Sequence, residues 1–115
     1  MADQPNIIFL MPDQLRHNFL GAYGADFLET PNIDRLSEEG VRYERCYSEH
    51  PVCVPARVSL LTGMHGFKTG VLDNGQFLRP DYRDMGLATW PEMLNEAGYY
   101  TASIGKMHFY PWDAR

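Results

Sequence analysis

A short, uninterrupted apolar run near the start of the chain constrains the fold more than any other feature of the sequence. Residues 6–11, Asn-Ile-Ile-Phe-Leu-Met, carry no charge and are followed at once by Pro12 and Asp13. An apolar run of this length, closed by turn residues, is typical of a strand that is buried on both faces. Such a strand needs neighbouring strands and covering layers, which predicts a sheet inside a layered fold.

Strand-like and helix-like segments alternate along the rest of the chain. Strands are predicted over 41–47 and 99–104, and the stretch 69–86 is predicted to be a loop. Helices are predicted from Pro31 to before Gly40, from Pro55 to before Gly63, and from Trp90 to before Gly98. The last of these helices begins with the capping-box spacing of Thr89 and Glu92. This alternation predicts an α/β fold with a largely parallel or mixed sheet flanked by helices.

Length and charge narrow the classes of function. With 115 residues, the chain has room for one core, so we expect a single domain over 1–115. A net charge of −5 with scattered Lys and Arg argues against a nucleic-acid-binding surface. The polar start lacks the basic flank of a secretory signal, and the run 6–11 is too short to span a membrane. We therefore expect a cytoplasmic protein without a membrane partner.

Three polar clusters stand at the ends of the predicted strands. Asp13 and Gln14 follow the first strand, Cys53 follows the second strand and precedes a helix, and Lys106 and His108 follow the last strand. Ligands and catalytic groups of open α/β sheets gather at the carboxyl ends of the strands. The sequence therefore predicts that these side chains meet at one edge of the sheet.

The most specific pattern is Cys53-Val54-Pro55-Ala56-Arg57, followed by Leu60-Leu61-Thr62-Gly63. It matches the C-x-P-x-R and L-T-G motifs of type I sulfatases. Three other segments match the family in the same order: the strand 6–11 leading to Asp13, Thr30-Pro31-Asn32-Ile33-Asp34-Arg35-Leu36, and Gly105-Lys106-Met107-His108. On these residues the chain resembles the amino-terminal part of a formylglycine-dependent sulfatase of the alkaline-phosphatase-like superfamily. Family members are several times longer, so the resemblance implies that the rest of a sulfatase chain completes the site.

The resemblance implies that Cys53 is the nucleophile precursor. A separate maturation enzyme would oxidise it to formylglycine, whose hydrated form is a geminal diol. One hydroxyl attacks the sulfur of a small-molecule sulfate ester, and deprotonation of the other expels sulfate, so one hard step becomes two easier ones. An unmodified thiol cannot complete this cycle. Cys46 lacks these neighbours and is expected to be structural.

Other matching residues receive roles from the same resemblance. Arg57 would steady the metal site and the ionised hydroxyl, Lys106 would contact the sulfate and the departing oxygen, and His108 would contact a diol hydroxyl. Lysine can serve as an electrostatic clamp or general acid, and histidine can exchange a proton near neutral pH. Asn74 resembles a substrate-contacting asparagine, but Asp73-Asn74-Gly75 is equally well explained as a turn.

The resemblance also implies a divalent metal, with Asp13, Gln14 and the oxygen of residue 53 among its ligands. Calcium is expected, with magnesium or manganese as other possibilities, because carboxylate and amide oxygens suit hard cations. Many sulfatases have a second aspartate at the position of Gln14. Two alternatives stay open: a phosphonate monoester or phosphodiester hydrolase with the same nucleophile, and a non-catalytic truncated fragment.

Overall fold

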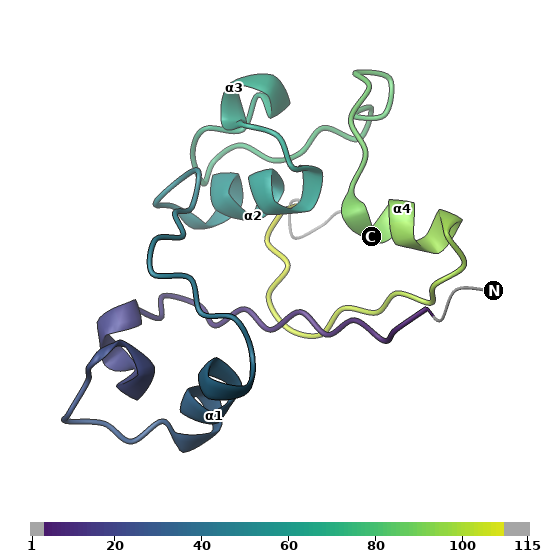
Figure 1. Cartoon of the computed structure of the whole chain (residues 1–115). Coiled ribbons are helices and arrows are strands. Elements are labelled where there is room, and N and C mark those ends of the chain that lie inside the picture. Colours follow the sequence, from purple (N-terminus) through teal and green to yellow (C-terminus); the bar gives the residue numbers. More distant parts are fainter. Residues whose placement is uncertain (1–3, 110–115) are drawn as a thin grey trace. The chain divides into compact units, whose positions relative to one another are not determined.

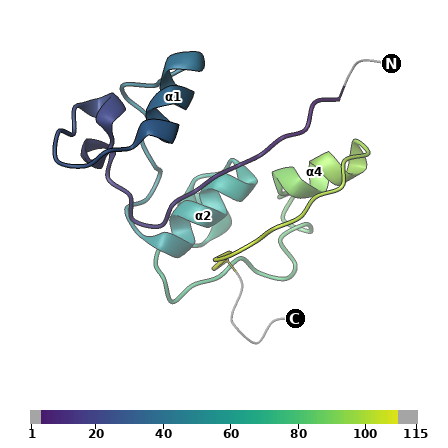
Figure 2. The same cartoon turned by 90° about the horizontal axis from the view of Figure 1, so that it is seen from below.

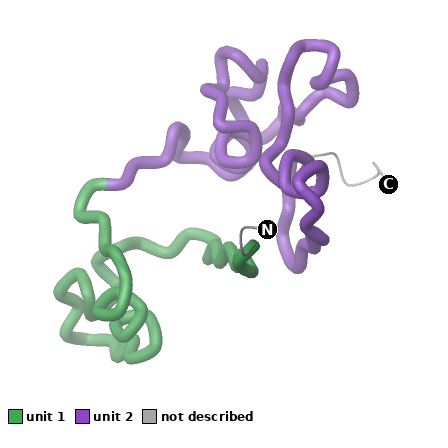
Figure 3. Tube along the Cα trace, turned by 45° about the vertical axis from the view of Figure 1, so that its right-hand side comes forward, with its two compact units in different colours: residues 1–45 green, residues 46–115 purple. Residues whose placement is uncertain are grey.

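The computed structural model of the protein describes residues 4–109, drawn in Figure 1. The elements within this range are η1 (His17–Phe19), η2 (Gly21–Tyr23), α1 (Pro31–Glu39), α2 (Cys53–Thr62), α3 (Gly66–Thr69) and α4 (Trp90–Glu96). The chain divides into two compact units, Met1–Arg45 and Cys46–Arg115, which Figure 3 distinguishes by colour.

The predicted sheet is absent from the described residues, so the predicted α/β fold is wrong for this part of the chain. No strand occurs within residues 4–109, and Figure 1 accordingly draws no arrows. The apolar side chains of the expected strands are exposed instead: Ile8 is 82% exposed, Val41 80% and Ile104 100%. A strand exists only where a neighbouring segment completes its ladder of backbone hydrogen bonds. The local apolar pattern of these segments therefore does not suffice to form a sheet.

The first unit is organised around the amino end of α1. Pro31 is the first residue of this helix, as predicted, because its fixed φ suits a helix start and its missing N–H is not needed there. Thr30 Oγ1 accepts a hydrogen bond from the Gly21 N–H at 2.9 Å, and Asp34 Oδ1 accepts one from the Ala22 N–H at 2.7 Å. These two bonds fasten η2 to the first turn of α1.

The second unit contains the buried core, with α2 at its centre. The core side chains are Val54, Val58, Val71, Leu78, Tyr82 and Leu87, with Phe77 and Phe109 packed against them. Val54 and Val58 are both 0% exposed and lie four residues apart, so they occupy one face of α2. The helix begins at Cys53, two residues before the predicted start. It ends at Thr62, and the next residue, Gly63, takes the left-handed conformation (φ 65°) that favours glycine.

Two further helices and a returning segment complete this unit. The predicted capping box of α4 is present at Thr89 and Glu92. The short helix α3, which the sequence pattern did not predict, begins after His65, whose Nδ1 accepts a hydrogen bond from the Phe67 N–H at 3.2 Å. Figure 2 shows the segment after α4 returning to α2. This return brings residues 105–109 to the C-x-P-x-R motif, where Arg57 contacts Lys106. Across residues 4–109, no helix is both long enough and apolar enough to cross a membrane.

Candidate active site

Cys53 is the first residue of α2, and it is half-buried. Val52 precedes it as the N-cap residue, and its carbonyl accepts a hydrogen bond from the Ala56 N–H at 3.1 Å. Since Pro55 has no N–H, the N–H groups of Cys53 and Val54 are the ones in the first turn that need acceptors outside the helix. The Cys53 N–H and the positive end of the helix dipole therefore lie at residue 53, an arrangement that favours an anion.

Lys106 brings a positive charge to Cys53. Its Nζ lies 3.7 Å from Cys53 Sγ, although the two residues are 53 positions apart in the sequence. Both residues were predicted to be site residues, and the structure brings them together within one unit. If residue 53 is converted to formylglycine, Sγ marks the place of an oxygen on Cβ, and the ammonium is then within reach of negative charge that develops there.

Arg57 connects α2 to the segment that carries Lys106. The residue is only 7% exposed, and its Nη1 donates a hydrogen bond to the backbone carbonyl of Lys106 at 2.6 Å. A hydrogen bond from a charged, planar guanidinium is stronger and more directional than one between neutral groups. Arg57 therefore holds the backbone of Lys106 while the ammonium of Lys106 extends to Cys53.

His108 lies in a tight segment that is anchored to the core. Gly105 has a φ of 95° and His108 a φ of 51°, so the chain takes left-handed conformations on both sides of Lys106. The Leu78 N–H donates to the Phe109 carbonyl at 3.1 Å, and the His108 ring lies edge-on to Phe77, with the centroids 6.4 Å apart. His108 thus lies on a segment that is held at both ends, by Arg57 at the Lys106 carbonyl and by Leu78 at the Phe109 carbonyl. The proton-transfer role of His108 stays a prediction.

Asn74 contacts the first turn of α2 and also lies in the predicted turn. Its Oδ1 accepts a hydrogen bond from the Val54 N–H at 2.9 Å. The turn is closed by Asp73, whose Oδ1 accepts a hydrogen bond from the Gly75 N–H at 2.7 Å. Asn74 therefore lies in the predicted turn and also contacts the residue next to Cys53. A contact between Asn74 and substrate stays a prediction.

Asp13 and Gln14 belong to the first unit, whereas the other predicted site residues belong to the second. Both are exposed, and Gln14 has a φ of 60°. Within residues 4–109, Gln14 and His108 are the two non-glycine residues with positive φ, and both are predicted site residues. Backbone strain of this kind is concentrated at functional sites in proteins. The positive φ values are therefore an independent indication that these two positions belong to a functional site.

The sequence matches the family model described as Sulfatase over residues 5–115. The chain belongs to the sulfatase family. It is 38% identical to an N-acetylglucosamine-6-O-sulfatase of Bacteroides thetaiotaomicron, over 91% of this chain and 18% of that protein. It is 39% identical to an arylsulfatase of Clostridium perfringens, over 94% of this chain and 22% of that protein, and 42% identical to human arylsulfatase D, over 93% and 19%.

All predicted site residues lie within the part of the chain that matches the sulfatase family. The chain spans about a fifth of the length of these three curated relatives. Membership in the sulfatase family therefore rests on the segment that contains Cys53, Arg57, Lys106 and His108.

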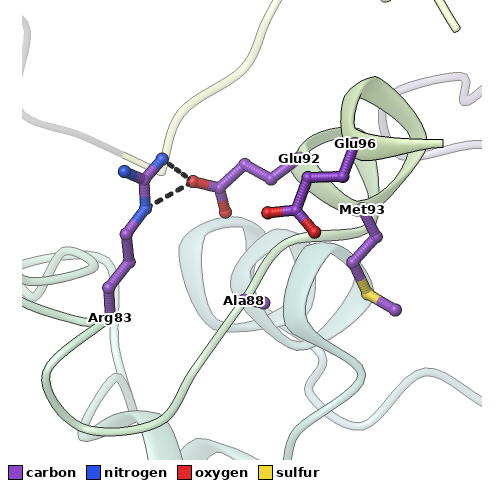
Figure 4. A pocket seen from close by; sticks show the side chains of 5 residues that line it. All are labelled: Arg83, Ala88, Glu92, Met93 and Glu96. Carbon is purple, nitrogen blue, oxygen red and sulfur yellow. Dashed lines mark hydrogen bonds and ion pairs between the residues drawn. The ribbon is translucent and has the colours of Figure 1, made fainter. Parts of the chain in front are cut away.

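A hollow of about 280 Å³ lies beside α4, and Figure 4 shows the side chains that line it: Arg83, Ala88, Glu92, Met93 and Glu96. None of the predicted sulfatase site residues lines it.

Glu92 is the centre of a cluster of polar contacts at the start of α4. Its Oε1 accepts a hydrogen bond from the Tyr82 hydroxyl at 2.5 Å and forms an ion pair with Arg83. Its Oε2 accepts a hydrogen bond from the Thr89 N–H at 2.9 Å. Burial raises the pKa of Glu92, but these hydrogen bonds outweigh that effect and lower the pKa from 4.5 to about 2. This cluster fastens the 79–89 loop to α4.

Proposed function

We propose that the intact protein is a sulfuric ester hydrolase that cleaves sulfate monoesters with a formylglycine made from Cys53. The observation that carries this proposal is the position of Cys53 as the first residue of α2, with Lys106 Nζ 3.7 Å from its sulfur. A nucleophile at a helix amino end and beside an ammonium group is suited to an anionic sulfate. Membership in the sulfatase family supports the same class of reaction.

The formylglycine of the matured protein would supply one hydroxyl that attacks sulfur and a second whose deprotonation releases sulfate. The residues of this chain prepare and assist that chemistry. Lys106 donates to the oxygen of the departing alcohol or to the sulfate, since its ammonium is the cation beside residue 53. Arg57 fixes the Lys106 backbone. His108 holds or moves a proton near residue 53.

A divalent metal, with calcium as the first candidate, belongs to this proposal. Asp13 and Gln14 offer a carboxylate and a carboxamide oxygen, which are the donors that calcium prefers. Calcium takes about six to eight oxygen ligands. Within residues 4–109, no group of three or more His, Cys, Asp and Glu side chains is arranged to hold a metal ion. The donor chemistry therefore fits the cation, and further ligands are needed to complete the site.

The relatives support the type of bond that is cleaved, while they differ in the alcohol. Their names denote sulfatases that act on N-acetylglucosamine 6-O-sulfate or on aryl sulfates. We therefore propose sulfate monoesters as the substrate class and choose an aryl sulfate as the test substrate.

The proposal is tested on the intact protein, produced together with a formylglycine-generating maturation enzyme. We expect the mass of the Cys53 peptide to show conversion of the thiol to the aldehyde, and an aldehyde-reactive probe to label the protein. Cys53→Ala should abolish hydrolysis of an aryl sulfate. Cys46→Ala is the matched control, because Cys46 is also a free cysteine but lies outside the motif.

Three results would contradict the proposal. The first is an active protein whose Cys53 is entirely unmodified, and the second is a Cys53→Ala variant that retains wild-type activity. The third is a higher kcat/KM for an aryl phosphonate monoester or a phosphodiester than for the aryl sulfate, which would favour the related hydrolase instead. Maturation of Cys53 without turnover of any of these esters would favour a non-catalytic protein.

A further inference from the structure

The first turn of α2 receives its cap from outside the helix. A helix usually begins with Ser, Thr, Asp or Asn, whose side chain accepts a hydrogen bond from an N–H of the first turn. The N-cap residue of α2 is Val52, which has no such acceptor. The Val54 N–H instead donates to Oδ1 of Asn74, 20 residues further along the chain, at 2.9 Å. Asn74 thus performs the capping that the local sequence cannot supply.

Asn74 is presented to α2 by a braced turn. Asp73 Oδ1 accepts a hydrogen bond from the Gly75 N–H at 2.7 Å, and Gln76 Oε1 accepts one from the Leu72 N–H at 2.6 Å. Two core side chains flank the turn: Val71 is 1% exposed and Leu78 is 2% exposed. The turn is therefore fixed at both ends, so its Asn74 side chain can restrain the start of α2.

We infer that Asn74 is a positioning residue, which caps α2 and thereby fixes residue 53 relative to Lys106. Cys53 directly precedes Val54, the donor to Asn74, so a frayed first turn would displace residue 53 from the ammonium 3.7 Å away. The effect on turnover rests on the proposed sulfatase function, whereas the capping itself does not. This role differs from substrate contact, because it uses Oδ1 of Asn74 towards the backbone and leaves the amide N–H₂ group available.

The test compares Asn74→Ala and Asn74→Asp in the intact, matured protein. Alanine removes the acceptor, whereas aspartate keeps an oxygen for the Val54 N–H and lacks the N–H₂ group. We expect hydrogen exchange at the Val54 amide to be about fivefold faster or more in Asn74→Ala, and near the wild-type rate in Asn74→Asp. We also expect kcat for an aryl sulfate to fall about 10- to 100-fold in Asn74→Ala, with KM changed less, because the reacting group is misplaced.

A second variant gives α2 a local cap. Val52→Ser places a hydroxyl at the N-cap position, within reach of the N–H of Val54, the second residue of the helix. The double variant Val52→Ser/Asn74→Ala should regain slow exchange at Val54 and part of the lost kcat. It also keeps the test informative if Asn74→Ala alone is poorly folded, since the proposal requires that a local hydroxyl replace the remote carboxamide.

Each outcome separates the possible roles. Unchanged Val54 exchange in Asn74→Ala overturns the capping role. Faster exchange with unchanged kcat overturns the positioning role, and so does a rise in KM alone with unchanged kcat, because that pattern indicates substrate contact. Failure of the proposed function is distinguishable, because wild-type protein would then lack sulfatase activity while the exchange results kept their predicted order.

Discussion

Replacing Glu92 by glutamine should destabilise the second unit in a pH-dependent manner. The carboxylate accepts hydrogen bonds from the Tyr82 hydroxyl at 2.5 Å and from the Thr89 N–H at 2.9 Å, and it also pairs with Arg83. Glu92→Gln keeps the shape of the side chain and removes its charge. Because hydrogen bonds to a charged acceptor are stronger than those to a neutral one, the variant should lose free energy of unfolding at neutral pH.

The shifted pKa of Glu92 sets the size and the sign of this effect. Its value of about 2, against 4.5, corresponds to at most about 3 kcal/mol of stabilisation. The Arg83 side chain is 72% exposed and that of Glu92 is 22% exposed, so solvent screening reduces our expectation to about 1–2 kcal/mol. Since the pKa is lower in the folded state, this contribution is fully present above pH 4.5 and is lost as the pH falls towards 2.

The measurement is urea-induced unfolding of wild type and Glu92→Gln at several pH values from 7 down to 2. The difference in unfolding free energy should be largest at pH 7 and should approach zero near pH 2. Glu96→Gln is the matched control, because Glu96 lines the same hollow one turn further along α4 and its carboxylate has no hydrogen bond or ion pair within residues 4–109. A difference that stays constant over this pH range, or an equal loss in Glu96→Gln, would refute the argument.

Three other predictions concern the core, the helix end and the site. Val58→Ala should cost about 2 kcal/mol in urea unfolding, because Val58 is 0% exposed, and Leu60→Ala should cost less because Leu60 is 40% exposed; equal losses would contradict the assigned core. Gly63→Ala should lower stability by about 1 kcal/mol in thermal unfolding, since φ is 65° there, and an unchanged midpoint would argue against that conformation. Lys106→Ala should lower kcat/KM for an alkyl sulfate by about 10²–10³-fold and by less for an activated aryl sulfate, and equal losses would exclude assistance to the leaving group.

The helices could be predicted because their signals are local. Pro31 and Gly40 bound α1, and the capping box of Thr89 and Glu92 opens α4, as the sequence indicates. The sequence predicts the start of α2 two residues late, because proline favours the first helical position, whereas Pro55 occupies the third. The N–H groups of the first turn have no partner within the helix, so proline is tolerated at any position of that turn. A proline therefore limits the possible first residue of a helix to a few positions but does not identify it.

The sheet and the remote cap could not be predicted in the same way, because both depend on segments distant in sequence. The run 6–11 has the composition of a buried strand, but strand formation depends on a partner segment. At the site, the sequence shows that Val52 cannot cap α2 with its side chain and that Pro55 has no N–H. It therefore indicates that the first turn needs a remote acceptor, but only the structure identifies Asn74.

The left-handed backbone at Gln14 and His108 restricts which amino acids can occupy these two positions, independently of any chemistry. Valine, isoleucine and threonine carry a branched Cβ that fits this conformation poorly, whereas asparagine, aspartate and glycine adopt it more readily. Substitution to asparagine or aspartate therefore changes the functional group with little added backbone strain. Among homologous proteins, a narrow choice of residues at these positions would reflect backbone geometry as well as catalysis, so invariance there would overstate the catalytic importance of the side chain.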